Sequence, residues 1–165
     1  MPARGGSPSA RARPTRPPTD AFDDFLDLWA RLRADSARPG TVVLVEGERD
    51  TRSLRRLDLP GTIVEVHQGR TVSATAQALA STSRLVIVMT DWDTAGGHLA
   101  QRLKGFLGAE RLRLDLDYRR RFARILRGEL VHVEGLHGWA RRQAEKRGNV
   151  LELLLDGDAG GPLTE

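Results

Sequence analysis

The chain has 165 residues, of which 39% are hydrophobic and none is cysteine. This length accommodates one hydrophobic core, and the lack of cysteine excludes disulfide cross-links and thiolate metal sites. The net charge is +4 and is concentrated in residues 1–18, which contain four arginines and no acidic residue. No apolar run approaches the roughly 20 residues that a membrane helix needs, and the N-terminus lacks the apolar core of a secretory signal. We therefore expect a cytoplasmic protein without a membrane partner.

Residues 1–18 are rich in Pro, Arg, Ser and Gly and are predicted to form a disordered basic arm. The arm either stays solvated or contacts nucleic-acid phosphates. Asp20 is a candidate helix cap before an apolar series with helical spacing, namely Phe22, Phe25, Leu26, Trp29 and Leu32. Residues 19–38 are therefore expected to hold an N-terminal helix that packs on the sheet and ends at Pro39-Gly40.

Strand and helix patterns alternate from residue 41 to residue 114. Apolar runs predict strands at Thr41–Val45, Thr62–Val66 and Leu85–Met89, and a short edge strand at Arg111–Leu114. Helical patterns lie between them and continue at Thr71–Ser81, His98–Leu107, Asp117–Arg127 and Glu134–Lys146, before a C-terminal tail at 148–165. The alternation predicts an α/β fold with a mostly parallel sheet sandwiched by helices.

Two of the predicted strands end in acidic residues. Glu46 follows the first strand, and Asp91 and Asp93 follow the third. If these strands are parallel neighbours, about 4.8 Å apart, the three carboxylates meet at the edge where α/β sheets bind ligands. They repel one another by about 1 kcal/mol per pair even in water, and oxygen ligands favour Mg²⁺ or Mn²⁺ over zinc. We expect a metal site at Asp91, Asp93 and Glu46, with Trp92 facing away.

Several residues near this site have alternative interpretations. Asp93 also suits a helix N-cap, and Asp50 is expected to cap a helix rather than to bind metal. Gly96 and Gly97 are expected at the turn that opens the next helix, where they serve close helix–sheet packing or meet a phosphate with their N–H groups. The four histidines show no metal-ligand spacing, so each is expected to be structural or exposed.

Arginines supply the basic surface of the folded region. Arg120, Arg124 and Arg127 share one face of a predicted helix, and this face is either solvated or in contact with an RNA or DNA backbone. Arg49 and Arg70 lie at the same sheet edge as the acids if the predicted topology holds. The only tyrosine, Tyr118, is expected on a helix surface with its ring half-packed.

The pair Glu46-Gly47 and the stretch T-D-x-D-x-x-G at residues 90–96 resemble the two signatures of the Toprim domain. Topoisomerases, bacterial-type primases, recombination proteins of the RecR kind, OLD-family nucleases and the 5S ribosomal RNA maturase share this domain. With HQGRTVSATAQALA before it, TDWDTAGGHLAQRL looks most like the small stand-alone Toprim proteins of archaea and some bacteria. The resemblance covers roughly residues 41–135 and implies a Rossmann-like Toprim domain at 41–147.

The resemblance also implies roles for individual residues. Glu46 would act as general acid/base, Asp91 and Asp93 would bind Mg²⁺, and Gly47 and Gly96 would shape the two turns. The implied reaction breaks or makes a phosphodiester bond. Because the chain lacks the separate tyrosine domain of topoisomerases and the further domains of primases, we expect a nuclease on structured RNA or DNA. The alternative is a non-catalytic module of the RecR kind that binds nucleic acid, or a ribonucleoprotein or repair partner.

Overall fold

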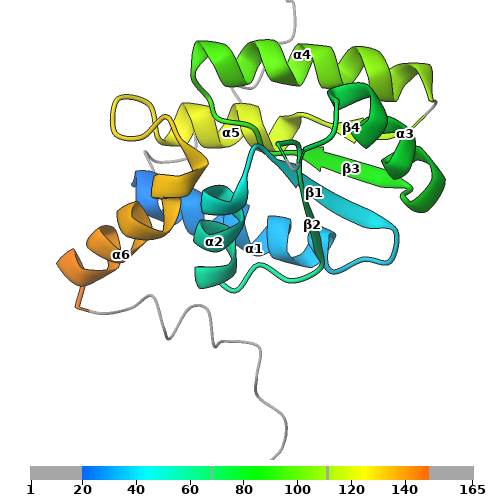
Figure 1. Cartoon of the computed structure of the whole chain (residues 1–165). Helices are drawn as coiled ribbons and strands as arrows, with labels where there is room; N and C mark the ends of the chain where they lie inside the picture. The colour runs from blue at the N-terminus through cyan, green and yellow to red at the C-terminus, as the bar shows by residue number, and fades with distance from the viewer. Residues whose placement is uncertain (1–19, 68, 111, 149–165) are drawn as a thin grey trace, which may run out of the picture.

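The computed structural model describes residues 20–67, 69–110 and 112–148. The predicted arm at 1–18 and nearly all of the predicted tail lie outside the described residues. Along the chain, the elements are α1 (Ala21–Ser36), β1 (Thr41–Val45), α2 (Glu48–Arg56), β2 (Thr62–Glu65), α3 (Val72–Thr82), β3 (Leu85–Val88), α4 (Thr94–Ala109), β4 (Arg113–Asp115), α5 (Asp117–Ile125), the 3₁₀ helix η1 (Val133–Gly135) and α6 (Leu136–Lys146) (Figure 1).

The strands form one parallel sheet in the order β2-β1-β3-β4 (Figure 1). In its register, Leu44 of β1 pairs with Val88 of β3, and Val45 pairs with Glu65 of β2. The predicted α/β fold with a parallel sheet is therefore confirmed, as is the edge position of the last strand. The carboxyl ends of β1 and β3 are neighbours, which places the residues after them side by side.

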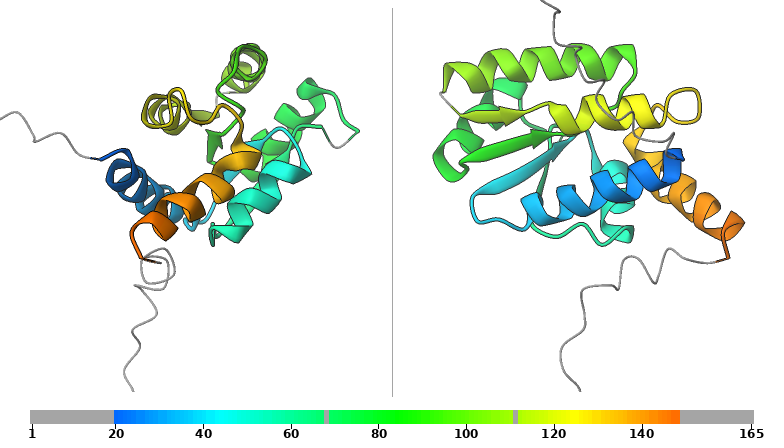
Figure 2. Two further views of the ribbon diagram at one scale, coloured as in Figure 1. Left: turned by 90° about the vertical axis from the view of Figure 1, so that its left-hand side faces the viewer. Right: turned by 180° about the vertical axis from the view of Figure 1, so that it is seen from behind.

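Alternating side chains of the central strands create two cores, one on each face of the sheet. From β1, Val43 and Val45 pack with α1, α2, α5 and α6, whereas Val42 and Leu44 pack with α3 and α4. Figure 2 shows the sheet enclosed by helices. Every residue of β1 is buried because both faces of the sheet are covered.

The N-terminal helix α1 supplies half of the buried aromatic side chains, and its apolar face packs into the core as its spacing predicted. Asp20 caps it by accepting a hydrogen bond from Phe22 N at 2.9 Å. Phe25 meets Trp139 of α6 edge to face, with ring centroids 5.1 Å apart. The guanidinium of Arg147, at the end of α6, pairs with Asp20 and with a second aspartate of α1. These contacts fix α6 to the start of α1.

The segment between α5 and α6 passes under the end of β3. We call residues 130–134 the return segment. The indole Nε1 of Trp92 donates to Leu130 O at 2.7 Å, and Trp92 N donates to Val131 O at 3.0 Å. The return segment is thereby brought to the carboxyl edge of the sheet, about 40 residues along the chain from β3. Within the described residues, no helix has the length and apolar character needed to cross a bilayer.

Candidate metal centre

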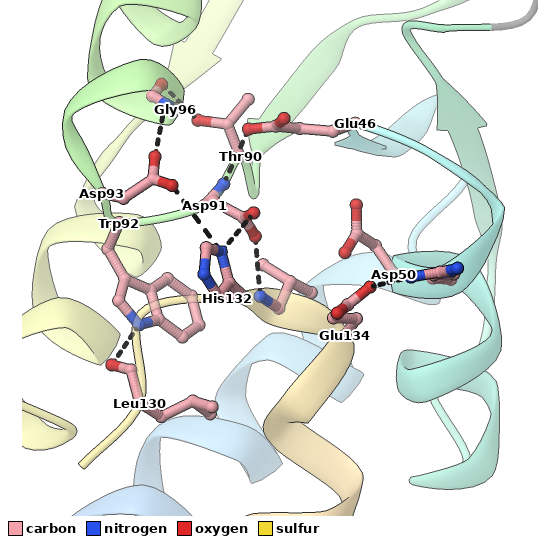
Figure 3. A network of polar contacts seen from close by, with 12 residues as sticks. Glu46, Asp50, Thr90, Asp91, Trp92, Asp93, Gly96, Leu130, His132 and Glu134 are labelled. Atoms are coloured by element: carbon pink, nitrogen blue, oxygen red, sulfur yellow. Dashed lines mark hydrogen bonds and ion pairs between the residues drawn. The ribbon is translucent and has the colours of Figure 1, made fainter.

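Glu46 and Asp91 lie at adjacent strand ends and contact each other. Met89 N donates to Leu44 O at 2.8 Å, which continues the pairing of β1 and β3 beyond β3 itself. Two residues further along each segment, Glu46 Oε1 accepts a hydrogen bond from Asp91 N at 3.1 Å (Figure 3). The close approach of Glu46 to the aspartate pair, expected from the strand pattern, is present.

Asp91, Asp93 and His132 form the group that could hold a metal ion. His132 Nδ1 lies 2.9 Å from Asp91 Oδ2 and 3.6 Å from Asp93 Oδ2. One ligand atom from each residue lies within 4.8 Å of the other two. Trp92 points away from them toward Leu130, as predicted (Figure 3).

The other oxygens of the two aspartates are held by backbone amides. Val133 N donates to Asp91 Oδ1 at 2.7 Å, so the return segment anchors this carboxylate from below. Gly96 N donates to Asp93 Oδ1 at 2.7 Å, which makes Asp93 the N-cap of α4. Because of this cap, α4 begins at Thr94, and the helix start predicted at His98 is wrong by four residues. Asp93 therefore caps a helix and also belongs to the acidic group.

Arg119 and Thr90 stabilise the turn that carries both aspartates. The guanidinium of Arg119 donates to Thr90 Oγ1 at 3.0 Å and to Asp91 O at 2.6 Å. Thr90 in turn donates its hydroxyl to Gly96 O at 2.9 Å. A Cβ on Gly96 would lie 2.0 Å from Asp91 O, so only glycine permits this approach of α4 to the turn. Gly97 lies beside Arg119, but a Cβ there would be 3.5 Å from Arg119 Nη2, which is an ordinary contact distance.

Two carboxyl groups at this edge are shifted toward their neutral forms. Burial raises the pKa of Glu46, and the negative charges of Asp91 and Asp93 add to the shift, although the hydrogen bond from Asp91 N opposes it. Burial also raises the pKa of Asp50 to about 6. The N-cap of α2 is Gly47, so the prediction of Asp50 as the residue that caps the helix start is wrong by three residues. Asp50 still contributes to the cap from inside the first turn, where its Oδ2 accepts from Gly47 N at 3.1 Å.

The arginines singled out in the sequence are spread over the surface. Arg120, Arg124 and Arg127 are exposed, but α5 ends at Ile125, so Arg127 lies beyond the helix on which the three were expected to share a face. Arg124 lines a hollow between α5 and α1. Arg70 lines a separate hollow beside β2 and α3. Arg49 is the member of this set that reaches the return segment, where its Nη1 lies 3.7 Å from a glutamate oxygen.

Tyr118 corrects one expectation. Its ring is buried, not half-packed, and its hydroxyl donates to Asp35 Oδ2 at 2.6 Å. Burial, followed by this bond to a carboxylate, raises the pKa of Tyr118 far above its usual value. A phenol held in this way is unsuited to act as a nucleophile.

His132 and Arg119 are the site residues that sequence reasoning missed. His132 is exposed, as expected, but it also lies against both aspartates, and no spacing rule connects it to residues about 40 positions earlier. Arg119 belongs by sequence to the run of arginines on its helix. It stands three and seven residues before the buried Phe122 and Leu126, and this spacing is a signal that its side chain points inward.

Comparisons with known proteins agree with this architecture. The model of the Toprim domain matches residues 41–125. A UPF0292 protein of Methanosarcina barkeri is 30% identical over 122 residues, which cover 74% of this chain and 84% of the relative. A UPF0292 protein of Thermococcus gammatolerans is 33% identical over 117 residues, which cover 71% of this chain and 84% of the relative. A solved structure of a protein from Aquifex aeolicus superposes with a TM-score of 0.56 at 23% sequence identity. The match covers 66% of this chain and 94% of the Aquifex chain, and it supports the fold alone.

Proposed function

Because the chain belongs to the Toprim domain family, whose domains bind divalent metals and are associated with nucleic acids, we propose that it is a metal-dependent nuclease on structured RNA or DNA. The observation that carries this proposal is the convergence of Glu46 with the Asp91, Asp93 and His132 group at one sheet edge. Nucleases of this kind need a metal-binding group next to a carboxylate that accepts a proton. Here the three carboxylates follow two adjacent strands, and the return segment adds His132.

The donor set fits a divalent cation. Asp91 Oδ2 and Asp93 Oδ2 both face His132 Nδ1, so the three ligand atoms already point toward a common space. Carboxylate oxygens suit Mg²⁺ and Mn²⁺, and an imidazole nitrogen favours a transition metal such as Mn²⁺. When bound, the cation supplies Lewis-acid polarisation of a phosphodiester oxygen.

The remaining roles fall to groups already described. Glu46 lies beside the metal group with a raised pKa, which brings it closer to the working pH of a general base. In hydrolysis, water oxygen would bond to phosphorus, its proton would pass to the Glu46 carboxylate, and the bond from phosphorus to the leaving oxygen would break. Arg119 is a positioning residue, because its hydrogen bonds go to the turn that carries Asp91.

One observation favours a second candidate function. Both carboxylate oxygens of Asp91 already have partners within the protein, one in Val133 N and the other in His132. An aspartate satisfied in this way is stable without a cation. This supports a non-catalytic module of the RecR kind that uses the same edge to bind nucleic acid or a ribonucleoprotein or repair partner.

Cleavage assays separate the two candidates. Labelled RNA and DNA hairpins are incubated with the protein in Mn²⁺, Mg²⁺ or EDTA, and the same is done for Glu46→Gln. The matched control is Glu48→Gln, two residues away, whose exposed carboxylate pairs with Arg52 at 2.7 Å. We expect metal-dependent cleavage that falls by about 10²–10⁴-fold in Glu46→Gln and is retained in Glu48→Gln. Hairpin binding without cleavage would instead support the module.

Metal binding is measured separately by thermal denaturation. A cation present at a hundred times its dissociation constant stabilises the folded state by about 2.7 kcal/mol. We expect Mn²⁺ to raise the melting temperature of the wild type and of Asp117→Asn, an exposed control on α5. The rise should be lost in Asp91→Asn and in Asp93→Asn. An equal rise in all variants would place the metal elsewhere.

A further inference from the structure

An arginine-lined cleft opens beside the candidate metal centre. It lies where α2, η1 and α6 meet and has a volume of about 470 Å³. Helices α2 and α6 pack next to each other (Figure 1), and η1 contacts both. The charged and titratable residues that line the cleft are Arg49, Arg52, Arg56, Arg142, Glu134 and His137. Its volume falls in the range of small-ligand pockets, and four of its lining side chains are permanent cations.

The positive charge of this cleft is only partly neutralised. Arg49 faces Glu134 at 3.7 Å, and Arg52 pairs with a glutamate of its own helix. Across the described parts of the chain, no carboxylate forms an ion pair with Arg56 or Arg142. Two guanidinium groups in one cleft therefore have their hydrogen-bond donors free for a ligand.

Gly138 and Ser53 lie on opposite walls of the cleft. A Cβ on Gly138 would lie 3.4 Å from Arg142 Nη1, so the guanidinium of Arg142 lies close to this part of α6. His137 N donates to Ser53 Oγ at 3.1 Å, and Ser53 is buried on α2. This bond fixes the start of α6 against α2, so both walls of the cleft are held in place without a ligand.

His137 also lies in a positively charged environment. Burial lowers the pKa of His137, and the charges of Arg56 and Arg141 lower it further. The imidazole thus stays neutral near pH 7 and can donate or accept a hydrogen bond. A ligand with several negatively charged oxygens would satisfy the two guanidinium groups and this ring together.

The cleft and the candidate metal centre share the return segment. Val133 N holds Asp91 Oδ1, and the next residue, Glu134, lines the cleft. Figure 3 shows Glu134 and Asp50 on the α2 side of Asp91. A polymer with regularly spaced negative charges could therefore contact the cleft while one of its phosphodiesters reaches the acidic group.

We propose that the cleft between α2, η1 and α6 binds phosphate groups of a nucleic-acid backbone next to the bond presented to the metal centre. The position of that bond rests on the proposed function, but phosphate binding by the cleft does not. Arg142, His137 and Glu134 lie beyond residues 41–125, which the Toprim domain model matches. The wall that they form is thus an addition to the matched part of the fold.

The test compares Arg56→Gln/Arg142→Gln with Arg102→Gln/Arg113→Gln. The control pair also removes two exposed arginines, from α4 and β4, and neither lines the cleft. Fluorescence anisotropy measures the binding of labelled RNA and DNA hairpins in EDTA, so no metal-dependent cleavage intervenes. We expect the cleft variant to bind about tenfold more weakly. The slope of log K against log salt should also fall by roughly 0.7–0.9 for each phosphate that the variant no longer neutralises.

The outcomes distinguish this proposal from the proposed function. A weaker affinity and a smaller salt slope in the cleft variant alone support the cleft, even if no condition gives cleavage. Equal reductions in affinity for the cleft and control variants would overturn it, because they would indicate a diffuse charge effect. Binding of inorganic phosphate or a mononucleotide by the wild type, without hairpin binding, would overturn the assignment to a nucleic-acid backbone. Circular dichroism and melting temperature check that both double variants fold.

Discussion

Replacing Gly96 by alanine tests the packing that positions the acidic group. The new Cβ would lie 2.0 Å from Asp91 O and 2.7 Å from the carbonyl carbon of the same residue. These are backbone atoms, so neither can rotate out of the way. Either α4 must move away from the turn or the turn must shift. Either movement weakens the bonds from Gly96 N to Asp93 and from Thr90 to Gly96 O.

The expected loss of stability follows from these two effects. Forcing an extra methyl group into a packed site costs about 1–3 kcal/mol, and losing a hydrogen bond to a charged acceptor adds about 1.5–3 kcal/mol. We therefore expect Gly96→Ala to lower the free energy of unfolding by about 3 kcal/mol or more. With a urea dependence of about 1–3 kcal/mol per molar, the unfolding midpoint should fall by roughly 1–3 M. Metal binding should be lost in parallel, because Asp91 and Asp93 move.

Two further glycines of α4 serve as controls in the same urea titrations. Gly97→Ala brings a methyl group to ordinary contact distance of Arg119, so its effect should stay within about 1 kcal/mol. At Gly105, in the middle of the helix, a Cβ would meet no described atom within 4 Å. Gly105→Ala should therefore stabilise the protein by about 0.5–1 kcal/mol. An unchanged midpoint in Gly96→Ala would refute the close approach of α4 to the turn.

Three other substitutions test individual contacts. Burial raises the pKa of Asp50 to about 6, so the folded state binds more protons than the unfolded state between about pH 4 and 6, and stability falls as pH rises through this range. Asp50→Asn should reduce that fall in urea titrations and leave the part that the raised pKa of Glu46 contributes. Arg119→Lys keeps the charge but loses the paired donors of the guanidinium, and should lower stability by about 1.5–3 kcal/mol. Tyr118→Phe removes the hydrogen bond to Asp35 and should lower the free energy of unfolding by a similar amount, with hairpin cleavage unchanged.

The fold could be predicted because its signals are local. The apolar runs in β1 and β3 are too continuous for surface strands, and the helical patterns between strands leave a parallel sheet as the consistent arrangement. If β1 and β3 are also neighbours, as the structure shows, Glu46 and the acidic pair after β3 meet at one edge. The predicted start of α4 is wrong because Gly96 and Gly97 have the character of turn residues, although Asp93 caps the helix before them.

The rest of the candidate site could not be predicted because it depends on contacts between distant segments. His132 and Val133 reach Asp91 only after α5 has crossed the sheet and the chain has turned back under β3. Neither contact could be predicted from the residue type. Val133 contributes only its backbone amide, which every residue except proline has, and a histidine without metal-ligand spacing occurs in many environments. The inward orientation of Arg119 could have been predicted, because the sequence places it three residues before Phe122 on the same helical face.

The electrostatics of the site explain why the two functional candidates share one geometry. Asp91 and Asp93 stand two residues apart and would repel each other at this edge. The chain supplies countercharge and donors from two directions, with Arg119 behind the turn and His132 in front of it. Arg119 contacts the backbone carbonyl of Asp91 and not its carboxylate, whose oxygens are bound by Val133 N and His132. His132 contacts those oxygens from an exposed position, so the place that it occupies is also the one from which a cation would reach both carboxylates.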